Sequence, residues 1–200
     1  MRVLLIGSTG RLGAAVHDAL KQRHEVVTAS RSGGDHAVDI RDPSAIAALY
    51  EQVGRVDAVA CAAGSVPYRP LGDLTHEDLR TGVADKLLGQ VELVRRGIPH
   101  VADDGSFTLI TGILARHPIR TGAVASLVNG ALESFVKAAA VELPGRQRIN
   151  AVSPTVFTEA LDVYGSSFPG FLPVPLRDVA ATYVRSVEGV QTGQVFELGQ

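Results

Sequence analysis

The chain has 200 residues, of which 46% are hydrophobic and 20% charged, a composition typical of a soluble globular protein with one domain and a full core. A formal net charge of -2 argues against nucleic acid and anionic membranes as partners. The single cysteine, Cys61, excludes an internal disulfide framework and fits a reducing compartment. Because an apolar run follows Met1 almost at once and no run approaches the length of a membrane span, we expect a cytoplasmic protein without a signal peptide.

The first apolar run, residues 3–6, leads into a glycine-rich turn and then into a helical pattern that extends to about Gln22. Glycines spaced as Gly-x-x-Gly-x-x-Gly permit a tight turn, and the helix N-terminus offers unpaired N–H groups to an anion. We therefore predict a phosphate-binding turn for a nucleotide; the alternative is an ordinary glycine-rich turn between a strand and a helix. The predicted residues are Gly7, Ser8, Thr9, Gly10, Arg11, Leu12 and Gly13.

Strand and helix patterns alternate along the rest of the chain. The expected strands cover residues 25–29, 37–40, 56–61, 106–110, 148–152 and 194–198. The expected helices cover residues 43–53, a long segment from residue 75, 124–141 and about 176–186, with a long loop over 154–175. This alternation predicts an α/β fold with a doubly wound parallel sheet of about seven strands, in a single domain of residues 1–200. Such sheets bind ligands at the carboxyl ends of their strands.

Local signals mark the ends of several elements. Only residues 31–36 separate the second and third strands, too few for a helical crossover, so we predict that one helix is missing at this edge of the sheet. Asp42 before Pro43 predicts the start of one helix. Thr75 with Asp78 predicts a capped start of the long helix.

Several motifs occur in the order found in a known family. They are the glycine turn, Asp39-Ile40, Cys61-Ala62-Ala63-Gly64, Asn150-Ala151-Val152-Ser153-Pro154 and Thr192-Gly193-Gln194-Val195. On these motifs the chain resembles the short-chain dehydrogenases/reductases over nearly its whole length. The resemblance implies a Rossmann fold and an NAD(P)(H)-dependent oxidoreductase. It also implies cofactor contacts by Asp39 and Ile40 at the adenine, by Cys61, Ala62, Ala63 and Gly64, and by Pro154, Val156 and Thr158, with Thr158 near the nicotinamide amide. The Pro-Gly pair usual in the family is here Pro154-Thr155.

The end of the second strand indicates which cofactor is preferred. An acidic residue there would accept a hydrogen bond from the free 2′-hydroxyl of NAD(H), whereas a guanidinium suits the 2′-phosphate of NADP(H). The chain has Ser30-Arg31-Ser32 at this point and Arg11 in the glycine turn. These residues favour NADP(H), with NAD(H) as the alternative; Arg31 could otherwise be an ordinary solvated loop arginine.

The catalytic positions depart from the family pattern. The resemblance implies a serine after the fifth strand and a Tyr-x-x-x-Lys pair on the next helix, but Ala125 falls at the tyrosine position and Asn129 at the lysine position. Thr111 or Gly112 falls at the serine position. Thr111 could hold a carbonyl oxygen by a hydrogen bond, or it could be a strand-end threonine whose bonds are already satisfied.

Lys86 aligns with an asparagine that the family carries on the long helix. It could serve as a proton donor or a ribose contact if burial lowered its pKa; otherwise it is a solvent-facing lysine. Asn129 could bind a ribose hydroxyl without supplying charge. The predicted catalytic set is therefore Lys86, Thr111 and Asn129.

Other candidates are weaker. Tyr50 and Tyr183 fall inside helices and are expected to be packing residues, whereas Tyr68 and Tyr164 fall on loops at the expected mouth of the site. His117 follows the fifth strand and is the histidine best placed for acid–base work. The spacing of cysteine and histidine indicates no metal site. The apolar loop from residue 158 to 175 suggests a lid over a hydrophobic substrate.

These observations predict an NADP(H)-dependent oxidoreductase for a small, apolar carbonyl or alcohol substrate. The alternative is an NADP(H)-binding protein that has lost catalysis and acts as a cofactor sensor or partner-binding module. The resemblance further implies a homodimer or homotetramer. Neither nucleic acid nor membrane is expected as a partner.

Overall fold

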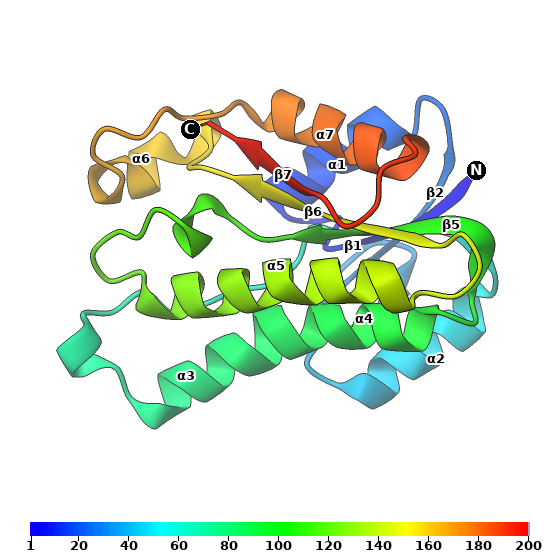
Figure 1. Cartoon of the computed structure of the whole chain (residues 1–200), viewed down its shortest axis with the longest axis horizontal. Helices are drawn as coiled ribbons and strands as arrows, with labels where there is room; N and C mark the ends of the chain where they lie inside the picture. The colour runs from blue at the N-terminus through cyan, green and yellow to red at the C-terminus, as the bar shows by residue number, and fades with distance from the viewer. Residues whose placement is uncertain (200) are drawn as a thin grey trace.

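The computed structural model describes residues 1–199 and contains a sheet of seven parallel strands in the order β3-β2-β1-β4-β5-β6-β7 (Figure 1). The strands are β1 (Arg2–Ile6), β2 (Glu25–Ser30), β3 (His36–Ala37), β4 (Val56–Cys61), β5 (Val101–Ile110), β6 (Arg148–Pro154) and β7 (Val195–Leu198). The predicted doubly wound sheet is confirmed. Its order reverses between β1 and β4, and the carboxyl ends of these two strands are where such sheets open a ligand crevice.

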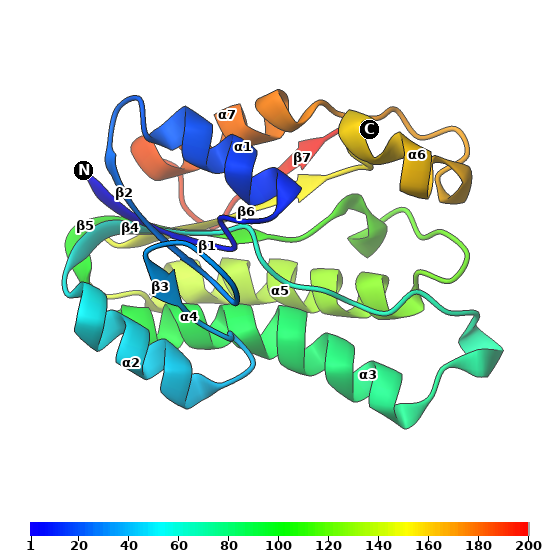
Figure 2. The same ribbon diagram turned by 180° about the vertical axis from the view of Figure 1, so that it is seen from behind.

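Helices cover both faces of the sheet (Figures 1 and 2). They are α1 (Arg11–Leu20), α2 (Pro43–Val53), α3 (His76–Gly82), α4 (Gly89–Gly97), α5 (Ala123–Glu142), α6 (Leu161–Tyr164) and α7 (Leu176–Glu188). On one face α1 and α7 form a buried cluster with β1 that includes Val16 and Tyr183. On the other face α2, α4 and α5 enclose a larger cluster that includes Leu93 and Phe107. In Figure 1, α3 and α6 lie beyond the end of the sheet to which the strand arrows point.

The edge of the sheet at β3 lacks a helix, as predicted. Residues 31–35 form the whole connection from β2, and the Asp35 carboxylate stabilises this turn by accepting hydrogen bonds from the backbone N–H (2.9 Å) and hydroxyl (2.8 Å) of Thr28. The strand itself covers residues 36–37 and not 37–40, because the chain leaves the sheet after Val38 donates to the Ser30 carbonyl (2.9 Å).

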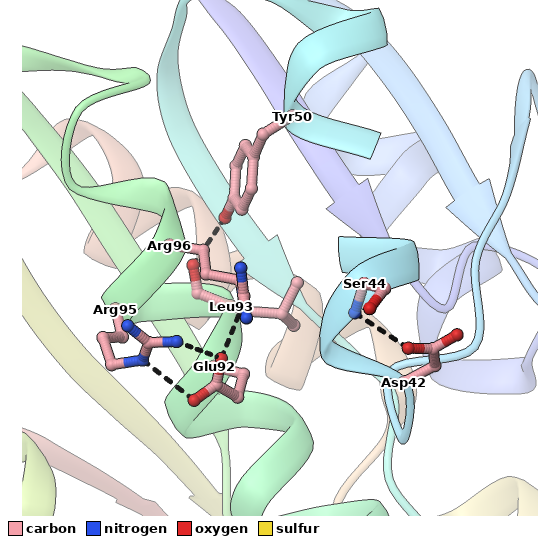
Figure 3. A network of polar contacts seen from close by, with 7 residues as sticks. All are labelled: Asp42, Ser44, Tyr50, Glu92, Leu93, Arg95 and Arg96. Carbon is pink, nitrogen blue, oxygen red and sulfur yellow. Dashed lines mark hydrogen bonds and ion pairs between the residues drawn. The ribbon is translucent and has the colours of Figure 1, made fainter. Parts of the chain in front are cut away.

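Both predicted helix starts are confirmed. The Asp42 carboxylate accepts a hydrogen bond from the backbone N–H of Ser44 (2.8 Å) at the start of α2 (Figure 3). Thr75 and Asp78 form a reciprocal capping box at the start of α3. Each cap satisfies backbone N–H groups that a helix otherwise leaves without partners.

The two tyrosines inside helices are packing residues, as expected. Tyr50 is fully buried, and its hydroxyl donates to the Leu93 carbonyl (2.6 Å), which ties α2 to α4 (Figure 3). Tyr183 is also fully buried, and its hydroxyl donates to the Cys61 carbonyl (2.7 Å), which ties α7 to the end of β4. Burial raises the pKa of both phenols, so neither is suited to acid–base work.

The long helix after residue 75 contains an irregularity that periodicity did not predict. Between α3 and α4 the segment Val83–Leu88 is π-helical, and the N–H of Gly89 bonds the Ala84 carbonyl. Such wide turns occur often at functional sites because they change the direction of the side chains that follow. Lys86 lies on this segment.

Two sequence-based expectations need correction. One expectation is that no apolar run approaches membrane-spanning length. However, α5 is 20 residues long with a mean hydropathy of 1.3, and it therefore has the length and composition of a membrane-spanning helix. Packing of its buried face, which includes Val128, Leu132 and Val136, accounts for that composition within this fold. The segment after β6, predicted to be a loop, contains α6 and two single turns of 3-10 helix at Thr158–Ala160 and Gly165–Ser167.

Candidate functional site

Two cavities adjoin at the carboxyl ends of the strands. The glycine-loop cavity, of about 240 Å³, is bounded by residues 6–7 and 9–10, the end of β2 and residues 62–65. The Lys86 cavity, of about 360 Å³, is bounded by Lys86, the end of β5 and the segment after β6. Both are lined by Ala62, Gly64 and Ser65, so one elongated ligand could occupy the two together.

Most of the predicted cofactor residues line these cavities. Those in the glycine-loop cavity are Gly7, Thr9, Gly10, Ser30, Arg31, Ser32, Asp39, Ile40, Ala62, Ala63 and Gly64. Those in the Lys86 cavity are Leu12, Ala62, Gly64, Lys86, Pro154 and Val156. The remaining predictions, which line neither cavity, are Ser8, Arg11, Gly13, Cys61 and Thr158.

The glycine loop, residues 7–13, has the geometry of a phosphate cradle. Gly7 adopts a φ of +85°, which an L side chain rarely tolerates, and its N–H bonds the Ala29 carbonyl (2.7 Å). Gly13 allows α1 to pack directly on this turn. Gly10 is the N-cap of α1 and provides no side-chain cap, while the buried hydroxyl of Ser8 has no hydrogen-bond partner within residues 1–199. Uncapped N–H groups and an unpartnered hydroxyl fit a bound anion.

The end of β2 presents a guanidinium to the glycine-loop cavity. Arg31 is exposed and, within residues 1–199, forms neither a hydrogen bond nor an ion pair, whereas Asp39 is held by the Arg41 guanidinium (Nε to Oδ1, 2.9 Å). That contact lowers the pKa of Asp39 to about 2. The hydroxyl of Ser30 is occupied, because it donates to the carbonyls of Gly33 (2.7 Å) and Ser32 (3.1 Å).

Arg11 does not join Arg31 at this end of the site. Its guanidinium donates instead to the Glu159 carbonyl (2.7 Å), so it anchors the segment after β6 to the start of α1. Cys61, which was predicted to contact the cofactor, lines neither cavity. It is fully buried in the core, and its thiol donates to the Ala63 carbonyl (3.5 Å). Burial raises the pKa of this thiol to about 12.

The side chain of Lys86 lines the cavity that we name after it, and contacts with neighbouring residues fix the position of this side chain. Its ammonium donates to the Thr111 carbonyl (3.1 Å), at the end of β5. A Cβ on Gly64, whose φ is +129°, would lie 2.7 Å from the Lys86 Cγ, so glycine at this position makes room for the lysine stem. Buried Gln90 joins the helix to β5, because its amide donates to the carbonyls of Lys86 (3.1 Å) and Ile110 (2.9 Å).

The environment of Lys86 changes its acidity. Burial of the ammonium lowers its pKa to about 8, opposed by the electrostatic influence of Cys61, Asp85 and Glu133. A lysine in this range exchanges protons readily near neutral pH. The sequence left open whether Lys86 faces solvent or the site, and the structure places it in the cavity.

Thr111 lines the same cavity, but its hydroxyl is engaged elsewhere. It bonds the Glu133 carboxylate (3.2 Å) and also lies 3.4 Å from the Val152 carbonyl. A hydroxyl has one proton, and both of these neighbours are acceptors. The Thr111 hydroxyl therefore has no proton left to donate to a substrate carbonyl. The structure therefore favours the alternative role, a strand-end threonine whose bonds are satisfied.

Behind Thr111 lies a buried polar network that sequence reasoning missed. The Glu133 carboxylate pairs with the Arg116 guanidinium and accepts a hydrogen bond from the Ser153 hydroxyl (3.0 Å). Arg116 also donates to Ser153 (2.9 Å) and pairs with Glu197 on β7 (3.2 Å). One signal was available: Glu133 is an acidic residue on a buried face of α5 that, apart from Asn129, is apolar.

Asn129 and Thr155 supply polar groups without partners in the lining of the Lys86 cavity. Both residues are buried, and within residues 1–199 neither the Asn129 Oδ1 nor the Thr155 Oγ1 has a hydrogen-bond partner. Because both residues also line the cavity, these two oxygens are candidates for hydrogen bonds to a group bound there. The replacement of the family's Pro-Gly by Pro154-Thr155 was the signal for Thr155. Thr158, the residue predicted near the nicotinamide, lines neither cavity, and its backbone N–H donates to the Val174 carbonyl (2.9 Å).

The rim of the Lys86 cavity is aromatic and apolar. Tyr68, Tyr164, Phe157 and Phe168 line it, so the segment after β6 forms a wall of the cavity. Ala125 packs beside this wall in a cluster with Ile113 and Leu114, where the phenol of the family pattern is missing. His117, by contrast, is exposed and lines a separate cavity, so the structure gives it no role beside Lys86.

The glycine loop, the sheet reversal and the two adjoining cavities are features of the dinucleotide-binding class of α/β proteins. A family model described as enoyl-(acyl carrier protein) reductase matches residues 12–172. The chain belongs to the short-chain dehydrogenase/reductase family, whose members are oxidoreductases that use NAD(P)(H).

Solved structures and curated proteins support this assignment. The protein lin1944 from Listeria innocua is 47% identical, with a TM-score of 0.97 and 98% of each chain covered. A small-chain dehydrogenase solved in complex with NADPH is 25% identical, with a TM-score of 0.87 and coverage of 100% of this chain and 96% of that one. Among curated proteins, a versicolorin reductase of Emericella nidulans is 27% identical over an alignment of 184 positions, with coverage of 76% of this chain and 68% of the relative.

Proposed function

We propose that this protein is an NADP(H)-dependent oxidoreductase in which Lys86 handles the proton. The observation that carries the proposal is that the glycine-loop cavity shares lining residues with a second cavity whose lining, within residues 1–199, contains a single cationic side chain, Lys86. The first cavity has the groups that bind a nucleotide. The second has a group that exchanges a proton beside an apolar wall.

The residues present fit NADP(H). The glycine loop would hold the pyrophosphate, and Arg31 with Ser32 would face the 2′-phosphate. The unpartnered oxygens of Asn129 and Thr155 would take hydrogen bonds at the other end of the cofactor. When bound, such a cofactor supplies transfer of a hydride to or from a substrate carbon.

The chain's own contribution to a reduction would be a proton at the substrate oxygen. An ammonium has three N–H groups, and the hydrogen bond from Lys86 to the Thr111 carbonyl uses one of them. The other two can serve an oxygen in the cavity, and a pKa of about 8 keeps most of the side chain protonated at neutral pH. The aromatic and aliphatic wall favours a small, apolar carbonyl or alcohol substrate.

Replacing Lys86 tests this role. We expect Lys86→Met to lower NADPH-dependent turnover by roughly 10² to 10⁴ while NADPH binding is retained, because general acid catalysis contributes about that much. Turnover would be measured with a panel of ketones, aldehydes, quinones and activated alkenes, and affinity by calorimetry. Lys137→Met, which alters an exposed lysine on α5, is the matched control. Equal turnover by wild type and Lys86→Met would refute the role.

Replacing Arg31 tests the cofactor preference. We expect Arg31→Asp to weaken NADPH binding at least about tenfold and to leave NADH binding unchanged or stronger, because a carboxylate repels a phosphate and accepts from a ribose hydroxyl. Calorimetry with both cofactors measures the preference. An Arg31→Asp variant that still preferred NADPH would show that the phosphate lies elsewhere.

A second candidate function rests on Ala125 and Asn129. Because neither can supply the phenol or ammonium of the family pattern, the protein could bind NADP(H) without turnover and act as a cofactor sensor or partner-binding module. Tight NADPH binding with no substrate turned over above background would favour this reading. Failure to bind either NADPH or NADH would refute both.

A further inference from the structure

The Lys86 cavity has an unbalanced charge. Within residues 1–199, no acidic side chain lines it together with Lys86. Asp85 lines the glycine-loop cavity instead, where its carboxylate accepts a hydrogen bond from the backbone N–H of Ser65 (3.3 Å). Glu133 lies behind Thr111, where it pairs with Arg116. A group entering the cavity therefore meets the positive charge of Lys86 with no carboxylate in the cavity lining, although Asp85 and Glu133 lie close enough to oppose the lowering of the Lys86 pKa.

The position of the adenosine half of the dinucleotide determines which half enters the Lys86 cavity. If the glycine loop holds the pyrophosphate and Arg31 the 2′-phosphate, as the proposed function requires, the adenosine half occupies the glycine-loop cavity. The nicotinamide half then extends past Ala62, Gly64 and Ser65, the residues common to both cavities. This part of the cofactor differs in charge between its oxidation states: the reduced ring is neutral, whereas the oxidised ring carries a positive charge.

We propose that Lys86 makes the protein distinguish the oxidation states of its cofactor, binding NADPH more tightly than NADP⁺. A cationic ring placed in a low-dielectric cavity with an ammonium is repelled, whereas a neutral ring is not. Because both cofactors carry the same phosphates, the contacts of the glycine loop and Arg31 cancel in the comparison. The preference favours the reductive direction if the protein is an enzyme, and it gives a sensor a signal to read.

The proposal fixes the direction of a pH dependence. NADP⁺ would be accommodated best by a neutral amine, so its binding releases a proton from Lys86, and its affinity increases as pH rises through about 8. The other ionisable groups near Lys86 are Asp85, Glu133, Cys61 and the rim tyrosines. Burial raises the pKa of Cys61 to about 12 and also raises that of Tyr68, so these two stay neutral over this range.

Calorimetry with NADPH and NADP⁺ tests the proposal without requiring a substrate. At about pH 7 we expect wild type to bind NADPH at least about tenfold more tightly, a difference of about 1.4 kcal/mol. At about pH 9 the ratio should fall towards one. Titration in two buffers of different ionisation enthalpy should show proton release with NADP⁺ and not with NADPH.

Three variants make the test specific to Lys86. Lys86→Met should reduce the NADPH/NADP⁺ ratio to within about twofold and abolish proton release, whereas Lys86→Arg, which keeps the charge, should retain the preference. Lys137→Met should behave as wild type. Equal affinities in wild type, or a preference that survives in Lys86→Met, would overturn the inference while leaving the proposed function intact. Binding of neither cofactor would overturn both.

Discussion

Gly13→Ala is expected to abolish NADPH binding and to reduce the free energy of unfolding by about 3 kcal/mol, the upper part of the range for overpacking. A Cβ on Gly13 would lie 2.0 Å from the Gly7 carbonyl oxygen and 2.9 Å from the Ser8 Cα. Both are backbone atoms of the glycine loop and cannot rotate aside as a side chain would. The first turn of α1 must then move away from β1, which removes the phosphate cradle. Urea denaturation and calorimetry with NADPH measure the two effects.

Gly130→Ala is the matched control for this substitution. Gly130 lies inside α5, and a Cβ there would have no heavy atom within 4 Å. Alanine is the better helix former by about 1 kcal/mol, so this variant should be slightly more stable and bind NADPH unchanged. If Gly13→Ala retained wild-type stability and affinity, the close packing of α1 on the glycine loop would be refuted as the basis of the site.

The fold was predictable because its signals are local and repeated. Glycine spacing after an apolar strand, helix caps at Asp42 and Thr75, and the short interval over residues 31–36 each limit the backbone independently of distant contacts. Together they specified the parallel sheet and its missing helix. The boundary of β3 was less predictable because hydrogen bonding to β2, and not the apolar residues themselves, determines where this strand ends.

The site was predictable in outline but not in the direction of its side chains. Arg11 and Arg31 look equivalent in sequence, yet Arg11 reaches a carbonyl of the segment after β6, a contact 148 residues away. The cavity position of Lys86 depends on the π-helical turn and on the space left by Gly64, which periodicity does not reveal. The hydroxyl of Thr111 was unavailable because of Glu133, whose position is known only once α5 packs on β6.

Arg116→Met should reduce the free energy of unfolding by about 2 to 3 kcal/mol. Arg116 joins three elements, because its guanidinium contacts Glu133 on α5, Ser153 on β6 and Glu197 on β7. Removing one partner of a buried pair leaves a desolvated charge, which costs about 3 to 5 kcal/mol. The guanidinium is 28% exposed, so water offsets part of this loss and the lower value is expected. Urea denaturation measures the change.

A double variant distinguishes two causes of the stability lost in Arg116→Met: an uncompensated carboxylate on Glu133, or the loss of packing by the arginine side chain. Adding Glu133→Gln to Arg116→Met removes the uncompensated carboxylate while keeping its shape, so the double variant should be more stable than Arg116→Met alone. Arg55→Met, which breaks an exposed pair with Asp103, should change stability by less than about 1 kcal/mol. A double variant no more stable than Arg116→Met would show that the guanidinium acts through packing. Recovery would instead show that Arg116 is needed because it neutralises the carboxylate that bonds Thr111, the residue whose carbonyl holds Lys86.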